Sequence, residues 1–213
     1  MQFIRNLYRP FLPPFLLFLC IVILNSSSVY AIENAILKSK QLIDTQGKYD
    51  EAIVILQKSL AHNPKNATAW YWLAIAHQKI NDNQKSQTEM EKAFALGLTK
   101  PYHLTGYDYL GWVYYKNYKF DMAFETFNKA LAINPGYFSS TKGRGLANNA
   151  LANYENAIKD FDFCIRIAPN DMELYRIRGI SFIILKNIKK LFLILTRHFQ
   201  KIFRVLRKET FYI

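Results

Sequence analysis

Residues 104–137, LTGYDYLGWVYYKNYKFDMAFETFNKALAINPGY, decide the fold of this chain. Small residues alternate with aromatic ones at helical spacing, with Gly111 in the first half and Ala123 in the second. Small residues let two helices approach closely, and aromatic side chains fill the space beside them. The stretch ends in Asn134-Pro135-Gly136, which is typical of a turn after a helix. It therefore predicts two short helices packed against each other.

A regular repeat period extends this pattern in both directions along the chain. The period is 34 residues. Residues separated by this interval are Gly111, Gly145 and Gly179; Ala123 and Ala157; Phe127 and Phe161; Pro135 and Pro169; and Ala52 and Ser86. The interval from Ser86 to Ala123 is longer, so three extra residues lie near Lys100 to His103. No single unit of this kind can bury its apolar face alone, so neighbouring units must stack.

The pattern resembles that of the tetratricopeptide-repeat family, whose unit is a helix-turn-helix of about 34 residues. The residues that carry the resemblance in the central unit are Tyr107, Leu110, Gly111, Tyr114, Phe120, Ala123, Phe127, Ala130 and Pro135. The resemblance implies an all-α solenoid, a right-handed superhelix of stacked units. We expect the array to span residues 32–187, with units at about 33–66, 67–100, 104–137 and 138–171 and a partial unit at 172–187. These are units 1 to 5 below.

Units 1, 4 and 5 depart from the family pattern, and in unit 5 Ile188 and Leu191 stand where an aromatic residue and an Ala should open the second helix. Ser39 and Lys40 stand where unit 1 should have a Leu and a small residue, which puts its first helix in doubt. In unit 4, Thr141, Arg144 and Asn148 replace the usual apolar residues of the first helix.

The N-terminal segment, residues 1–31, reads as a signal peptide. Arg5 and Arg9 precede the uncharged apolar stretch Phe11 to Leu24, and Val29-Tyr30-Ala31 follows as a small-residue cleavage pattern. An apolar stretch this short falls below the length needed to span a bilayer. We expect cleavage after Ala31 and an extracytoplasmic location, periplasmic or secreted. The alternative is an uncleaved anchor that holds the chain at a membrane.

Residues 188–213 are expected to form a basic amphipathic helix, and the repeat register is lost there. One stripe of this helix is basic and the opposite stripe apolar, namely Arg197, Lys201, Arg204 and Lys208 against Phe192, Leu195, Phe199, Ile202 and Leu206. The helix either caps the last unit or lies on an anionic membrane surface. An altered reading frame would also end the repeat pattern.

The net charge of +12 is concentrated at the two ends of the chain. From Lys186 to Ile213 there are eight Lys or Arg and a single acid, Glu209, and two arginines precede the apolar N-terminal stretch. The long middle is nearly neutral, so the charge does not indicate a nucleic-acid interface.

Catalytic and cofactor-binding motifs are absent from the sequence. No glycine-rich phosphate loop, nucleophile elbow or metal-ligand spacing is found, so we expect no enzyme, no cofactor and no metal site. His77 stands at a core position of the repeat. Cys164 occupies a small core position, where a reactive thiolate is disfavoured.

The resemblance implies that the first helix of each unit lines a concave groove that binds a partner. The side chains expected there are Tyr71, Ile75, Gln78, Asp108, Trp112, Tyr115, Lys142, Leu146 and Asn149. Asp108 and Trp112 stand where carboxylate-binding members of the family carry Lys and Asn, so that mode of binding is not expected. The groove suits an extended apolar peptide or an amphipathic helix from another protein. Alternatively, the chain's own N-terminal helix or a second protomer covers it.

These features predict a non-enzymatic scaffold that is exported and assists assembly of an envelope or secreted complex. The competing prediction is a membrane-peripheral structural protein, held by its uncleaved N-terminus or by the basic C-terminal helix.

Overall fold

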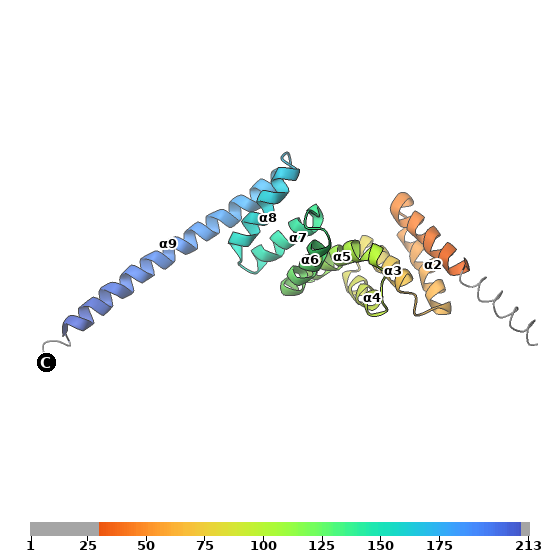
Figure 1. Ribbon diagram of the computed structural model, residues 1–213, viewed down its shortest axis with the longest axis horizontal. Coiled ribbons are helices and arrows are strands. Elements are labelled where there is room, and N and C mark those ends of the chain that lie inside the picture. The colour runs from red at the N-terminus through yellow and green to blue at the C-terminus, as the bar shows by residue number, and fades with distance from the viewer. Residues whose placement is uncertain (1–29, 210–213) are drawn as a thin grey trace, which may run out of the picture.

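The computed structural model describes residues 30–209, and helices follow one another along an elongated array (Figure 1). Residues 30–41 are helical and continue into the wider π-helical turn η1 (Leu42–Gln46). The helices that follow are α2 (Tyr49–His62), α3 (Ala67–Lys79), α4 (Asn83–Ala95), η2 (Lys100–Tyr102), α5 (His103–Lys116), α6 (Phe120–Ile133), α7 (Phe138–Ala150), α8 (Tyr154–Ile167) and α9 (Met172–Glu209). Within the described residues there is no strand, and the predicted all-α solenoid is confirmed. The predicted signal peptide lies almost wholly outside the described residues.

The turn between the two helices of a unit is made the same way four times. A residue in the left-handed region lies at the same repeat position in each, and the four are Gly47, Asn81, Tyr118 and Ala152, with φ between 59° and 63°. The next N–H then bonds back to the helix, as in Lys119 N to Tyr114 O at 2.9 Å and Asn153 N to Asn148 O at 2.8 Å. These bonds satisfy carbonyls that the end of the first helix would leave unpaired.

The doubt about the first helix of unit 1 was wrong. Ser39 is fully buried there, and its hydroxyl donates to the Ala35 carbonyl at 2.8 Å. A small side chain that bonds its own backbone fits the tight contact, and Leu42 and Ile43 carry the apolar packing one turn later.

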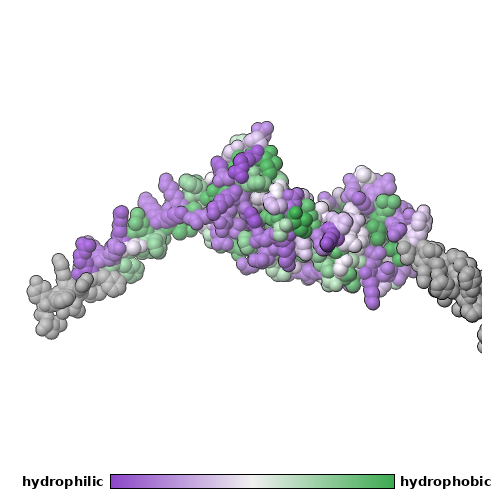
Figure 2. Space-filling view, viewed as in Figure 1, coloured by the Kyte–Doolittle hydropathy of each residue, from purple (hydrophilic) through white to green (hydrophobic). Residues whose placement is uncertain are grey.

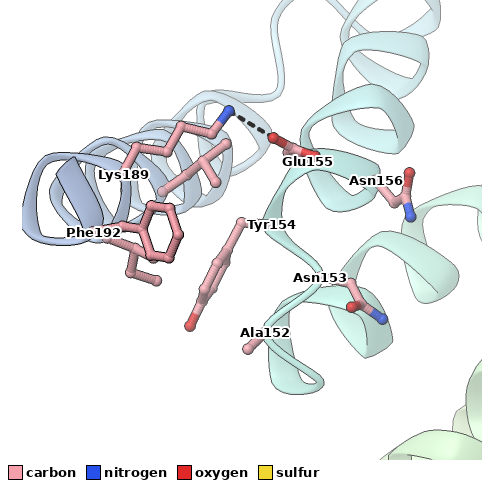
Figure 3. Close-up of a pocket in the computed structure, with 9 residues that line it drawn as sticks. Ala152, Asn153, Tyr154, Glu155, Asn156, Lys189 and Phe192 are labelled. Carbon is pink, nitrogen blue, oxygen red and sulfur yellow. Dashed lines mark ion pairs between the residues drawn. The ribbon is translucent and has the colours of Figure 1, made fainter. Parts of the chain in front are cut away.

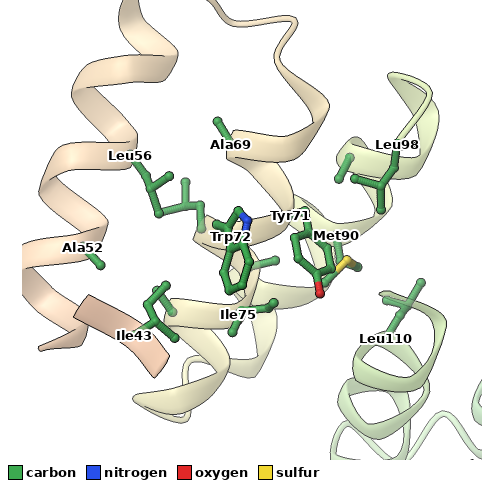
Figure 4. Packing of buried hydrophobic residues seen from close by; sticks show 14 of the residues in the cluster. Ile43, Ala52, Leu56, Ala69, Tyr71, Trp72, Ile75, Met90, Leu98 and Leu110 are labelled. Carbon is green, nitrogen blue, oxygen red and sulfur yellow. The ribbon is translucent and has the colours of Figure 1, made fainter. Parts of the chain in front are cut away.

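The three extra residues between units 2 and 3 form the short 3-10 helix η2. It places the Tyr102 ring 4.9 Å from the ring of Tyr71 and 6.3 Å from that of Trp72. Figure 4 shows Tyr71 and Trp72 inside the same apolar cluster as Leu56, Ile75 and Met90. The insertion therefore adds an aromatic side chain to the core of the N-terminal half.

Units 3 and 4 meet around one phenylalanine. Phe127 is fully buried, and a Cβ atom placed at Gly111 or Gly143 would lie 2.6 Å or 2.3 Å from its ring. Only glycine leaves room for the ring between helices α5 and α7, so the spacing of these helices depends on both positions.

Unit 4 replaces apolar contacts with a polar network. The Arg144 guanidinium donates to both carboxylate oxygens of Asp160, at 3.0 Å and 2.6 Å, and to Asn128 Oδ1 at 3.0 Å. Asn148 Nδ2 also donates to Asp160, at 3.3 Å. Two of the residues that depart from the family pattern, Arg144 and Asn148, thus share Asp160 as their acceptor, while the carbonyl oxygen of Asn148 stays buried without a hydrogen-bond partner.

Helix α9 continues without a break across the boundary expected between residues 187 and 188. Lys186 stands where the four earlier units have their left-handed turn residue, yet it is helical. Leu191 stands where Ala123 and Ala157 make close, fully buried contacts, and a leucine is too large for such a contact. The first part of α9, predicted as the partial unit 5, packs on α8, and the rest, which includes the helix predicted from residue 188 onward, extends past the array (Figure 1).

The extended part of α9 has an apolar and a basic side, both solvent-exposed. Figure 2 shows hydrophilic residues along one side of this arm and hydrophobic ones along the other. Phe192, Leu195 and Phe199 are 72%, 47% and 58% exposed, and Arg197 and Lys201 are exposed as well. No helix in the described part of the chain is long and apolar enough to cross a membrane.

Candidate functional site

A hollow of about 280 Å³ lies where the first helices of units 3, 4 and 5 meet. Its lining residues are Tyr115 of α5, Leu146, Asn149 and Ala150 of α7, Tyr154 of α8, and Ile180, Ser181 and Ile184 of α9. Tyr115, Leu146 and Asn149 were expected to face the groove, and the structure brings these three together. We refer to this hollow as the groove pocket.

The repeat period explains why these side chains converge. Tyr115 and Asn149 are one repeat period apart, and so are Leu146 and Ile180. Stacked units turn equivalent positions toward the same side, so each first helix contributes from the same place on its surface. The pocket is therefore lined by successive copies of the same repeat positions.

The pocket combines apolar walls with a few polar groups. Ser181 Oγ lies 2.8 Å from Asn149 Oδ1 and 2.8 Å from the Ile177 carbonyl oxygen, so its single hydrogen is shared between these two acceptors. Because the carbonyl oxygen of Asn149 is one of these acceptors, its amide nitrogen is the group that can donate to a ligand. Burial raises the pKa of Tyr115, which keeps its hydroxyl protonated and able to donate a hydrogen bond. Such a site fits an apolar segment with an accessible backbone carbonyl.

Two of the expected groove residues lie in the core instead. Tyr71 and Ile75 are only 3% and 2% exposed, so the expectation that they face a partner was wrong. The Tyr71 hydroxyl lies 2.8 Å from Thr105 Oγ1, and the Tyr102 ring covers the Tyr71 side chain. The physical reason is that the Tyr102 ring of η2 packs against Tyr71, while Ile75 lies within the apolar core cluster of the N-terminal half.

Asp108 was also expected in the groove, and it is buried. Ser139 and Ser140 donate to its two carboxylate oxygens at 2.9 Å and 2.7 Å. Burial raises the pKa of Asp108, although these hydrogen bonds oppose the shift. Asp108 therefore joins α5 to α7 and offers no accessible surface.

The remaining expected residues lie outside the groove pocket, and each is half-buried. Trp112 Nε1 donates to Ser139 Oγ at 3.0 Å, and its ring packs edge-on against Phe127. Lys142 Nζ is 3.5 Å from Asp171 Oδ2. Gln78 lies in the last turn of α3, away from the groove pocket.

A second hollow of about 420 Å³ continues along α9 beyond the groove pocket. Tyr154 lines both hollows, and Figure 3 shows its ring pointing into the space between Phe192 of α9 and the turn at Ala152. Lys189 Nζ and Glu155 Oε1 form an ion pair of 2.6 Å at its edge. Both partners are exposed, so this pair adds little stability.

The α9 residues of the groove pocket were not predicted from the sequence. Ile180 and Ile184 follow Leu146 and Ala150 by one repeat period. Extending the groove positions by one more period would have found Ile180. Tyr154 stands one repeat period after Phe120, at an aromatic packing position of the repeat, so it was not expected in a binding groove.

Groups with reactive potential lie in the core. Cys164 is fully buried, and burial raises the pKa of its thiol to about 11. His77 Nδ1 lies 2.7 Å from Glu89 Oε2, and both side chains are buried. Among the described residues, no group of three or more His, Cys, Asp or Glu is arranged to hold a metal ion.

Comparisons with known proteins identify the repeat. Two family models described as tetratricopeptide repeat match residues 45–97 and residues 105–137. The fold is similar to that of MamA, residues 41 to the end, from Desulfovibrio magneticus RS-1, with a TM-score of 0.65 and 19% identity, covering 84% of this chain and 96% of that one. It is also similar to YrrB, described as a TPR protein with an unusual peptide-binding site, with a TM-score of 0.65 and 17% identity, covering 75% of this chain and 84% of that one.

At this level of identity the solved structures show a common fold and nothing more. A sequence search of the curated proteins finds no significant match.

Proposed function

Since this chain is a tetratricopeptide-repeat protein, we propose that it is a non-enzymatic scaffold that holds a segment of another protein in the groove pocket. Repeats of this family serve protein–protein interaction. The observation that carries the proposal is the convergence of Tyr115, Leu146, Asn149 and Ile180 from three successive first helices on one hollow.

The chemistry of the pocket selects the kind of segment. Leu146, Ile180 and Ile184 favour an aliphatic or aromatic side chain, and the Asn149 amide favours a backbone carbonyl beside it. No Lys or Arg lines the pocket, so a terminal carboxylate has no cationic partner there. We therefore propose an internal, apolar stretch of the partner as the ligand, extended or helical.

A peptide selection tests the proposal. Peptides selected from a displayed library against the full chain should share an apolar anchor residue. Their affinity should fall at least about tenfold for the variants Leu146→Asp and Ile180→Asp, because the bound peptide would bury a carboxylate that has no partner. Val54→Asp is the matched control, since Val54 is an exposed apolar residue of α2, 64% exposed and outside the groove pocket. Peptides that bind all three variants equally would contradict the pocket assignment. Replacing Trp112 is a less specific test, because Trp112 packs on Phe127.

We also propose that the chain is exported and acts in assembly of an envelope or secreted complex. The support for export is that residues 1–31 begin with arginines, continue as an uncharged apolar stretch and end in a small-residue cleavage pattern. After expression in an exporting host, the mass of the undigested protein in the extracytoplasmic soluble fraction should be that of a chain that begins at Ile32. A full-length mass in the membrane fraction would instead indicate an uncleaved anchor.

A second candidate function is that of a membrane-peripheral structural protein. The observation that favours it is the extended part of α9, where the exposed apolar side of Phe192, Leu195 and Phe199 lies opposite Arg197 and Lys201. Such a helix suits the surface of an anionic bilayer. Flotation with vesicles that contain anionic lipid, with and without residues 189–213, separates the two: tail-dependent flotation supports the second candidate, and no flotation contradicts it.

A further inference from the structure

The last unit of the array has a first helix but no second one. Gly111, Gly145 and Gly179 are equivalent residues of units 3, 4 and 5. A Cβ atom at Gly111 would lie 2.6 Å from Phe127, and one at Gly145 would lie 2.9 Å from Phe161, because the second helix of each unit packs directly on the glycine. A Cβ atom placed at Gly179 would meet no atom of another helix or side chain within 4 Å among the described residues.

The side of α9 around Gly179 is otherwise built to receive a helix. Phe182 stands where Tyr114 and Asn148 face the second helix of their units; these two are 5% and 2% exposed, whereas Phe182 is 58% exposed. Tyr175 stands one turn before Gly179, where unit 3 has Tyr107. We name Tyr175, Gly179 and Phe182 the terminal face. It is distinct from the groove pocket, since Ile180 and Ile184 lie on another side of α9.

We propose that the terminal face binds an α-helix of a partner protein, which takes the place of the missing second helix of unit 5. The chain's own second helices show what fits: Ala123 and Phe127 in α6, and Ala157 and Phe161 in α8, all fully buried. The partner helix therefore carries a small residue and, four residues later, an aromatic one that sits over Gly179.

The charges around the terminal face add a requirement for acidic residues. Lys186 and Lys190 follow Gly179 by seven and eleven residues, on the same side of α9. An antiparallel second helix begins beside the end of the first, so its first turn lies next to these lysines. The second helices of units 1, 3 and 4 carry Asp50, Asp121 and Glu155 in that turn. An acidic first turn on the partner helix would complement Lys186 and Lys190.

Residues 188–199 of the chain do not cover the terminal face, because they continue α9 in a straight line. They keep apolar residues at positions equivalent to those of a second helix, such as Ile188 and Leu195. However, Leu191 replaces the small residue that a close contact needs. Cover by the chain's own tail is therefore an outcome that the experiment must separate from partner binding.

The experiment uses a peptide of residues 119–134 as the probe, because it contains the α6 pattern of Asp121, Ala123 and Phe127. Binding of the labelled peptide to the full chain is followed by fluorescence anisotropy. Gly179→Leu fills the space above Gly179 and should weaken binding by at least about tenfold. The fold should tolerate this change, since Gly179 faces open space. Thr196→Leu is the matched control on α9 and should leave binding unchanged.

Two further variants decide between outcomes. A peptide with Phe127→Ala should also bind at least about tenfold more weakly, because it lacks the aromatic ring over Gly179. In the full chain, Leu195→Asp should leave binding unchanged. Absence of binding by the unmodified peptide, or binding unaffected by Gly179→Leu, would overturn the proposal. Binding that strengthens with Leu195→Asp would overturn it too, since the chain's own tail would then be the occupant.

Discussion

Units 3 and 4 have the same length and helix order, yet their helices are held together by different forces. In unit 3 the first helix packs on the second through apolar and aromatic contacts, with Tyr114 buried and Phe127 fully enclosed. Unit 4 keeps the buried phenylalanine as Phe161, but at three other equivalent positions it has an ion pair and a hydrogen bond from an amide. The exchanged residues are Leu110, Tyr114 and Thr126 in unit 3 and Arg144, Asn148 and Asp160 in unit 4.

This difference shows that the repeat tolerates a polar interior in which the buried charge of Asp160 has its own donors, even though Asn148 Oδ1 has no hydrogen-bond partner. Asp160 accepts from Arg144 and from Asn148, so its charge is compensated where it is buried. The small residues are retained in both units, because they set how closely the helices approach. The spacing of the helices is therefore the constant feature, and the chemistry between them varies.

The largest expected effect comes from Phe127→Ala, which removes the ring shared by the two units. Phe127 is enclosed by Gly111, Gly143 and Trp112, so its loss leaves a cavity on both sides. We expect the free energy of unfolding to fall by about 3–5 kcal/mol in a urea titration. Phe182→Ala is the control and should change it little, because Phe182 is largely exposed. Equal effects of the two changes would show that Phe127 does not join the units.

Breaking the polar network of unit 4 should lower the free energy of unfolding less than Phe127→Ala does. Asp160→Ala leaves the Arg144 charge without its partner, and we expect a loss of about 2–3 kcal/mol, because Arg144 keeps some contact with water. The triple change Arg144→Leu, Asn148→Tyr and Asp160→Thr gives unit 4 the residues of unit 3. In the same urea titration this triple variant should have a higher free energy of unfolding than Asp160→Ala. A triple variant less stable than Asp160→Ala would mean that the two interiors are not exchangeable.

Alanine at two equivalent glycines should have effects of opposite sign. At Gly145 a Cβ would lie 2.9 Å from Phe161, so Gly145→Ala should destabilise the chain by about 1–3 kcal/mol. At Gly179 the space is open, and Gly179→Ala should stabilise the helix by up to about 1 kcal/mol. Thermal unfolding by circular dichroism measures both, and destabilisation at Gly179 would contradict the open terminal face.

The smallest effect is a pH dependence from Cys164 in unit 4. Its thiol has a pKa of about 11 in the folded state, raised by burial from 9.0. The folded state therefore keeps the proton more tightly, and stability falls as pH rises through this range. We expect a loss of about 1 kcal/mol between pH 9 and pH 10, measured by urea unfolding. The variant Cys164→Ala should lack this part of the slope, and an identical slope would refute the assignment.

Much of the fold could be predicted from particular residues. The glycine, alanine and aromatic columns predicted the helix pairs, and the longer interval from Ser86 to Ala123 placed the insertion at η2. Unit 1 was harder, because Ser39 satisfies its hydroxyl on its own helix, which no residue pattern reveals. Of the expected groove residues, Tyr115, Leu146 and Asn149 lie together, whereas Tyr71, Ile75 and Asp108 are buried.

The sequence by itself determined the repeat, because each column of small and aromatic residues is a local requirement of helices packed at close range. Only the tertiary structure decided which surfaces stay open. Tyr102 covers Tyr71 from the insertion between units 2 and 3, and α9 continues past the position where the four earlier units turn. Exposure depends on contacts between segments far apart in the chain, so a residue's repeat position does not reveal whether another unit covers it.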